Sequence, residues 1–148
     1  MGIKEVEIYT DGSCSGNTGP GGWGVILKYG DNIRELSGGS LNTTNNQMEL
    51  TAVIQGLAAL KTPCKVMLYT DSKYIVDAIN KGWLATWSRA GWCKSDKKPV
   101  ANIELWKVLI ALIGRHDVWF NWVKGHADNE YNNRCDKLAT METNRLKS

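Results

Sequence analysis

The sequence lacks the features that mark zinc-binding, secreted and membrane proteins. No two of its four cysteines form a C-x-x-C pair, which argues against a zinc site. Residues 1–6 do not form the apolar segment of a secretory signal, so we expect reduced thiols rather than disulfides, in a cytoplasmic protein. The most apolar run, residues 108–113, is far too short to cross a bilayer, which excludes a membrane protein.

Signatures of nucleotide cofactors and of repeat architectures are also missing. No Gly-Lys-Ser or Gly-Lys-Thr triplet is present, which excludes a P-loop. Residues 19–24 fit G-x-G-x-x-G, but we expect a strand rather than a helix after them, which argues against a dinucleotide site. Without repeats or linkers, 148 residues predict a single domain, residues 1–148, with an ordinary hydrophobic content of 43%. The net charge of +3 permits a nucleic-acid partner but does not require one.

The hydrophobic pattern predicts a meander of strands followed by alternating helices and strands. The expected strands are residues 6–10, 23–29, 33–41, 66–70 and 118–123, with a glycine-rich turn at 13–22. Thr44 and Gln47 form a capping-box pattern that opens a helix at about residues 45–60. Further helices are expected at 73–80, around 103–113 and from 131 to the end, with a short helix and an exposed loop between residues 81 and 98. This order indicates an α/β fold with helices packed on a mixed sheet.

One carboxylate lies on the apolar side of the first expected helix. Positions three, four and seven residues after Glu49 are Ala52, Val53 and Gly56, whereas the polar stripe lies opposite. A carboxylate that faces a core is costly unless it is paired or binds a metal. The alternative is an acid in the first turn, where the helix dipole favours negative charge.

Three more acids come from other segments. Asp11 and Asp71 follow predicted strands, where ligands bind in α/β sheets, although an Asx-turn for Asp11 and a helix cap for Asp71 are the alternatives. Asp136, early in the last helix, is by itself an ordinary solvated acid. If the four acids meet, their repulsion raises their pKa values and calls for hard cations such as Mg²⁺ or Mn²⁺. Two ions roughly 4 Å apart would clamp the attacking and leaving oxygens of a phosphodiester.

A histidine and a basic segment complete the set of candidates. His126 lies in a loop ten residues before Asp136 and is either solvated or a general acid/base, the latter only if the loop overhangs the metal site. Residues 81–98 combine three tryptophans with five basic residues and a single acid. Such a segment suits nucleic acid, although Trp83 and Trp87 could instead form a local core for the short helix.

The motifs, taken in order, resemble those of bacterial ribonuclease H, type 1, along essentially the whole chain. They are residues 9–14 with Asn17, residues 43–50, 70–72, 96–100, 122–127 and 134–136. The resemblance implies a five-stranded mixed sheet, three strands antiparallel and two more added in parallel, with helices on both faces. It also implies endonucleolytic cleavage of the RNA strand of RNA–DNA hybrids by two Mg²⁺ ions, giving 5′-phosphate and 3′-hydroxyl ends. The metal-binding and catalytic acids would be Asp11, Glu49, Asp71 and Asp136, with His126 assisting.

The resemblance also assigns contacts with the hybrid. Residues expected at the RNA strand, across the minor groove where 2′-hydroxyls mark RNA, are Cys14, Asn17, Asn45, Asn46 and Lys73. Backbone contacts of this kind imply cleavage that is largely independent of sequence. Trp83 and Trp87 correspond to aromatics that pack on the sugars of the DNA strand. By the same resemblance, Thr44 and Asn102 belong to a pocket for a DNA phosphate. We expect the protein to be a monomer.

The sequence departs from the family pattern in its basic residues. Asn42 stands at the position of the phosphate-pocket arginine, and the basic segment is diluted by Ser88, Ala90 and Cys93. We therefore expect weaker hybrid affinity and a shallower salt dependence than in a fully basic relative. The competing functions are a DNA nuclease built on the same fold and a hybrid-binding module without catalysis.

Overall fold

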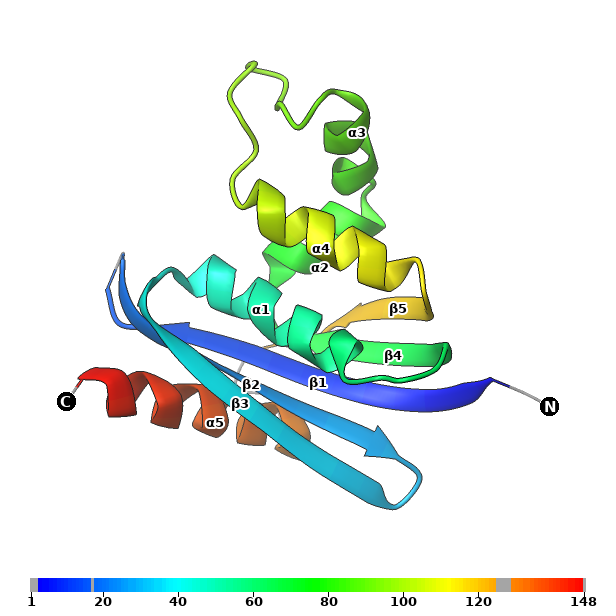
Figure 1. Ribbon diagram of the computed structural model, residues 1–148, viewed down its shortest axis with the longest axis vertical. Helices are drawn as coiled ribbons and strands as arrows, with labels where there is room; N and C mark the ends of the chain where they lie inside the picture. The colour runs from blue at the N-terminus through cyan, green and yellow to red at the C-terminus, as the bar shows by residue number, and fades with distance from the viewer. Residues whose placement is uncertain (1–2, 17, 125–128, 148) are drawn as a thin grey trace.

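The computed structural model describes residues 3–16, 18–124 and 129–147, and its centre is one five-stranded sheet (Figure 1). The strands are β1 (Lys4–Cys14), β2 (Gly19–Tyr29), β3 (Asn32–Thr43), β4 (Cys64–Thr70) and β5 (Asp117–Trp122). Their order is β3-β2-β1-β4-β5, in which β3, β2 and β1 pair antiparallel and β4 and β5 are added in parallel. The predicted mixed sheet is confirmed.

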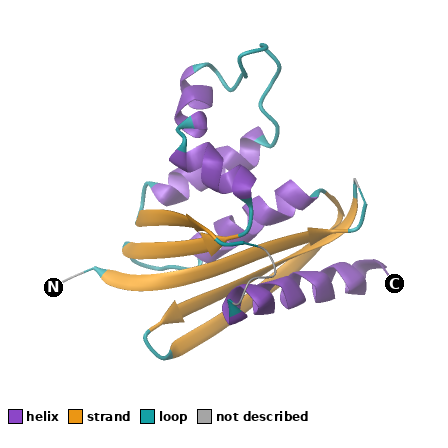
Figure 2. Ribbon diagram, turned by 180° about the vertical axis from the view of Figure 1, so that it is seen from behind, coloured by secondary structure: helices purple, strands orange, loops and turns teal. Residues whose placement is uncertain are grey.

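Five helices accompany the sheet in the described parts of the chain. They are α1 (Asn45–Ala58), α2 (Lys73–Asn80), α3 (Trp83–Arg89), α4 (Ile103–Ile113) and α5 (Glu130–Lys147). Figures 1 and 2 show α1, α2 and α4 on one face of the sheet and α5 on the other, which confirms the expected helices on both faces. Within the described ranges, no helix is long and apolar enough to span a membrane.

Two hydrophobic cores lie on opposite faces because successive side chains of a strand point in opposite directions. Ile8 of β1 packs in the large core beneath α1, whereas the next residue, Tyr9, packs with Ile26 and Cys135 beneath α5. The approach of α5 requires glycine on β2, since a Cβ at Gly24 would lie 2.5 Å from the carbonyl oxygen of Cys135. Both faces of the sheet are therefore covered, one by α1 and the helices beside it and the other by α5.

The bounds predicted for the glycine-rich turn, residues 13–22, are wrong, because β1 and β2 occupy most of that range. Gly12, Ser13 and Cys14 continue β1 and pair with residues 21–23 of β2. Glycine has a low strand propensity, which predicts a turn here, yet the close packing of α5 and of neighbouring strands requires it. As a result Asp11, which was predicted to lie at the end of its strand, lies inside β1.

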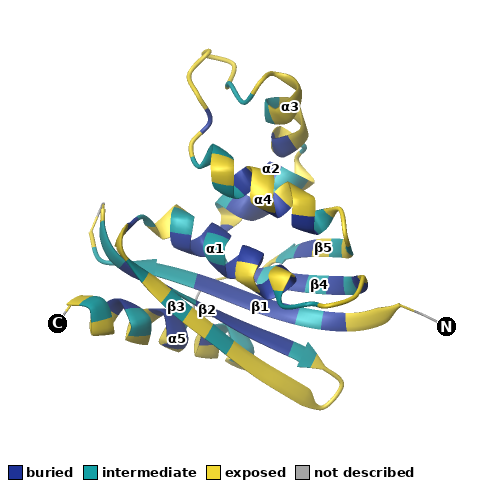
Figure 3. Ribbon diagram, viewed as in Figure 1, coloured by how far each residue is buried: buried dark blue, intermediate teal, exposed yellow. Residues whose placement is uncertain are grey.

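The Trp- and Lys-rich segment projects from the body of the protein. The short helix α3 and the segment that follows it stand away from the sheet in Figure 1, and Figure 3 shows them largely exposed. Residues 90–102 form an irregular connection, with left-handed backbone at Trp92, Lys97 and Asn102. The predicted short helix and exposed loop are both confirmed.

Candidate active site

The candidate site forms where β4 ends beside β1. These strands pair as far as Thr10 and Thr70, and Asp11 and Asp71 are the next residues of each, so the pairing sets the two carboxylates side by side. Beyond this point β1 is paired through residues 11–14 with β2, and β4 no longer lies beside it. The amide of Gly12 is therefore free to turn toward α1 instead of a neighbouring strand.

Glu49 reaches this opening from the buried side of α1. The residue is 4% exposed, so its predicted position on the core-facing stripe is confirmed. Its Oε1 accepts a hydrogen bond from the Gly12 amide, which also lies 2.8 Å from Oδ1 of Asp11. A Cβ at Gly12 would lie 2.5 Å from the backbone nitrogen of Glu49. Glycine at position 12 is thus what lets α1 bring its carboxylate to the strand.

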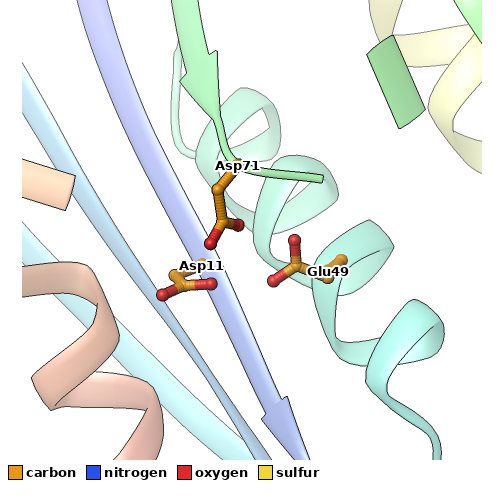
Figure 4. A group of neighbouring side chains, drawn as sticks. All are labelled: Asp11, Glu49 and Asp71. Carbon is orange, nitrogen blue, oxygen red and sulfur yellow. The ribbon is translucent and has the colours of Figure 1, made fainter. Parts of the chain in front are cut away.

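Three carboxylates meet at this point. Asp11, Glu49 and Asp71 offer oxygen atoms that all lie within 4.8 Å of one another, and Figure 4 shows these side chains pointing toward a common centre from β1, α1 and the end of β4. Asp136, on α5, is not part of this tight group. It lines the same cleft, which has a volume of about 360 Å³.

A helix cap next to Asp71 explains why its carboxylate is available. The hydroxyl of Ser72 accepts a hydrogen bond from the Ile75 amide at 3.3 Å and so caps α2. The alternative that Asp71 serves as this cap is therefore wrong. With the cap supplied by its neighbour, Asp71 lines the cleft.

Burial and mutual repulsion raise the pKa values of two of the acids, Asp11 and Glu49. Burial, followed by the charges of Asp71 and Asp136, raises the pKa of Asp11 to about 7, against the lowering effect of hydrogen bonds with Glu49 and Gly12. Burial and the charge of Asp11 also hold the pKa of Glu49 well above its usual range. An adjacent hard cation would remove this repulsion, and carboxylate oxygens are the ligands that Mg²⁺ prefers. The donor set thus fits a divalent cation.

The residues predicted to contact the RNA strand divide into two groups. Asn45 and Asn46, the first residues of α1, line the cleft together with Lys73, the first residue of α2. Cys14 does not line it; its half-buried thiol donates to the carbonyl of Thr43 at 3.3 Å. Asn17 and His126 lie outside the described residues.

The residues predicted to form the DNA-phosphate pocket precede two different helices, Thr44 before α1 and Asn102 before α4, and neither lines the acidic cleft. Thr44 caps α1 by accepting from the Gln47 amide at 3.2 Å, as the capping box predicts. The side chain of Gln47 does not close the box. It accepts from the Thr43 hydroxyl at 2.9 Å and donates to Oδ1 of Asn102 at 3.4 Å. Thr44 and Asn102 thus lie near one another through a bridge of neutral groups.

The two tryptophans predicted at the DNA strand have different environments. Trp83 is 41% exposed at the start of α3. Trp87 is half-buried and packs edge-on against the buried Trp106, with ring centroids 6.0 Å apart. Trp87 therefore helps to anchor α3 to the body while remaining partly exposed, and Trp83 is also partly exposed.

Several residues of the cleft were not found by sequence reasoning. They come from the starts of α2 and α5 and from the segments before α5: Ser72, Tyr74, Val123, Lys124, Asn129, Asn132 and Asn133. Asn132 and Asn133 had a detectable signal, because they precede Asp136 by four and three residues and so share its helix face. For the others, the sequence holds no comparable signal, since their proximity depends on how α5 docks on the sheet.

Comparison with known proteins gives consistent matches over almost the whole chain. The family model described as RNase H matches residues 3–144. A ribonuclease H of Chlorobium phaeobacteroides (strain BS1) is 62% identical over 138 residues, which cover 93% of this chain and 94% of the relative. A ribonuclease H of Thermoanaerobacter sp. (strain X514) is 59% identical over 145 residues, covering 97% of this chain and 92% of that protein.

Solved structures agree with the sequence relatives. LC9-RNase H1, a type 1 RNase H with the type 2 active-site motif, superposes with a TM-score of 0.86 at 31% identity over 99% of this chain and 75% of that one. LC11-RNase H1 in complex with an RNA/DNA hybrid gives a TM-score of 0.75 at 25% identity, over 97% of this chain and 99% of that one.

Proposed function

The chain belongs to the ribonuclease H family, and on this premise we propose that it is an endonuclease that hydrolyses the RNA strand of RNA–DNA hybrids. The observation that carries the proposal is the convergence of three carboxylates within 4.8 Å at the floor of an open cleft. The neighbour LC11-RNase H1, which binds an RNA/DNA hybrid, supports this choice of substrate.

We propose that Asp11, Glu49, Asp71 and Asp136 hold two Mg²⁺ ions, with Mn²⁺ as a substitute. When bound, the ions would supply charge compensation for the attacking water and the leaving 3′-oxygen, so that the products carry 5′-phosphate and 3′-hydroxyl ends. The Gly12 amide fixes Glu49 at its place in this set. His126 is proposed to assist proton transfer, as the family resemblance implies.

Recognition of the hybrid is proposed to depend on the rim of the cleft. The amides of Asn45 and Asn46 offer donors and acceptors suited to 2′-hydroxyls, and the Lys73 ammonium offers a charge to a phosphate. Cys14 and Asn17 are proposed to extend the contact with RNA, and Thr44, Asn102, Trp83 and Trp87 to contact the DNA strand. Because these contacts read backbone and sugar, cleavage should be largely independent of sequence.

The acids that line the cleft all come from one chain, so we propose that the monomer is active. The four cysteine thiols are free, which suits the reducing cytoplasm proposed as its location.

The experiment compares four substrates, each with Mg²⁺ and with EDTA: RNA–DNA hybrid, duplex DNA, duplex RNA and single-stranded RNA. We expect cleavage of the RNA strand of the hybrid alone, and only with the metal. Asp71→Asn should abolish turnover, since it removes a metal-binding charge, yet leave hybrid binding in place. Cleavage of duplex DNA would favour the alternative DNA nuclease, and undiminished activity in EDTA would refute the proposed metal site.

A further inference from the structure

A tryptophan that sequence reasoning left unassigned contacts two residues of the cleft at once. Trp122 is the last residue of β5 and is 48% exposed. Its indole Nε1 donates to the backbone carbonyl of Asp71 at 3.2 Å. Its ring lies under the ammonium of Lys73, with Nζ 5.7 Å from the ring centroid. One side chain thus links a carboxylate residue of the cleft and the basic residue on its rim.

The contact with Asp71 supports the chain where the sheet stops supporting it. Thr70, the last residue of β4, is paired with Trp122 itself, and its carbonyl accepts from the Val123 amide at 2.9 Å. Asp71 is the first residue beyond this pairing. The indole N–H therefore takes the place of a strand neighbour and holds the peptide that carries the Asp71 carboxylate.

The contact with Lys73 restricts a side chain that would otherwise move freely. Lys73 is exposed at the start of α2, and it forms no ion pair within the part of the chain that the structure describes. A lysine side chain has many rotamers, and ordering it on binding a phosphate costs conformational entropy. An ammonium over an indole face is held by the ring quadrupole while its charge stays available on the other side.

We propose that Trp122 is a positioning residue, which presets Lys73 for a backbone phosphate of the hybrid and Asp71 for a divalent cation. The two tasks use different parts of the indole: the ring face serves Lys73 and the N–H serves Asp71. The inference rests on the proposed function, since it names Lys73 as a contact to the hybrid and Asp71 as a metal ligand.

The two tasks are separable by substitution. Trp122→Phe keeps a ring under Lys73 but removes the N–H, whereas Trp122→Leu removes both. Lys73→Met and the double variant Trp122→Leu/Lys73→Met complete a mutant cycle. The matched control is Trp119→Leu, which removes a tryptophan that is 55% exposed on the same strand but pairs with Met67 and does not line the cleft. Thermal unfolding of every variant verifies that it folds.

Two binding measurements avoid any dependence on turnover. Fluorescence anisotropy of a labelled hybrid in EDTA measures hybrid affinity, which depends on the contact of Trp122 with Lys73. Isothermal titration calorimetry with Mg²⁺ alone measures metal affinity, which depends on the contact of Trp122 with Asp71. We expect Trp122→Leu to weaken hybrid binding about two- to fivefold, the effect of one cation–π contact, and Trp122→Phe to change it less than about twofold. Both variants should weaken Mg²⁺ binding about three- to tenfold, the effect of one lost hydrogen bond.

The mutant cycle gives the decisive result. If the indole acts through Lys73, the double variant binds the hybrid no more weakly than Lys73→Met alone. Additive effects would mean that Trp122 contacts the hybrid directly. Trp122 variants that bind the hybrid and Mg²⁺ as Trp119→Leu does would mean that Trp122 has no role at the cleft. Either result overturns the proposal. A wild-type protein that binds no hybrid would instead refute the proposed function, while the Mg²⁺ titration would still test the contact with Asp71.

Discussion

Replacing Asp11 with asparagine should stabilise the metal-free protein, by an amount that grows with pH. Asparagine resembles the protonated form of Asp11, so it can keep the place beside Glu49 and the contact of Oδ1 with the Gly12 amide. It removes the charge that burial and the neighbouring acids Asp71 and Asp136 oppose. The variant therefore isolates the electrostatic cost of an ionised carboxylate at this position.

The magnitude follows from the pKa. Asp11 has a pKa of about 7 in the folded protein and 3.8 in the unfolded reference, so between these values the folded state alone keeps the proton. Between these two pKa values, each rise of one pH unit lowers the free energy of unfolding of the wild-type protein by about 1.4 kcal/mol. The advantage of Asp11→Asn should thus be close to zero below pH 4, about 2 kcal/mol at pH 5 and about 4 kcal/mol above pH 7.

Urea unfolding in EDTA at pH 5 and pH 8, followed by circular dichroism, measures the two differences. Asp31→Asn, in the exposed turn between β2 and β3, is the control for loss of an ordinary carboxylate and should change neither value. If Asp11→Asn is no more stable than wild type at pH 8, or if its advantage is the same at both pH values, the electrostatic account of the cleft is wrong.

Two further substitutions test the geometry of the site. Gly12→Ala should destabilise the protein by about 1–3 kcal/mol and reduce hybrid cleavage, because its Cβ would lie 2.5 Å from the backbone nitrogen of Glu49. Urea unfolding compares it with Gly114→Ala, whose Cβ would make contacts no closer than 3.5 Å; equal effects of the two would contradict the reasoning. Asn42→Arg should strengthen hybrid binding and steepen the slope of log K against log salt by about one, as for one added phosphate contact. An anisotropy titration from low to high salt that gives an unchanged slope would mean that position 42 does not face the hybrid.

The sequence predicted regular elements best where hydrophobic periodicity and capping residues agree. Helix α2 has the predicted bounds, α4 spans the residues that recur at helical spacing, and α1 begins at the predicted residue after Thr44. The prediction failed at residues 13–22, where glycines signal a turn but are required by close packing of strands and of α5. A glycine in a sequence indicates either a turn or a strand position that another segment approaches closely, and only the atoms around its Cα distinguish the two.

The acids of the site were predictable for different reasons. Glu49 was detectable from its helix alone, because a carboxylate on an apolar stripe contradicts the pattern around it. Asp11 and Asp71 depend on the parallel pairing of β1 with β4, which are separated by two strands and a helix along the chain. Local patterns do not contain such pairings, so only the family resemblance could join these acids before the structure was known.

The arrangement of the cleft also constrains how stability and metal affinity are related. The pairing of Thr10 with Thr70 and the placement of α1 bring carboxylate oxygens of Asp11, Glu49 and Asp71 within 4.8 Å of one another through contacts of the chain itself. Their repulsion therefore destabilises the folded state without metal, and a bound cation relieves that same repulsion. A ligand that binds only the folded state stabilises it by an amount that grows with the logarithm of its affinity. Removing one of these carboxylates removes both the repulsion and a proposed metal ligand, so it should also lower the stabilisation by Mg²⁺. A site preset for cations and a maximally stable fold are, at these residues, incompatible demands on one sequence.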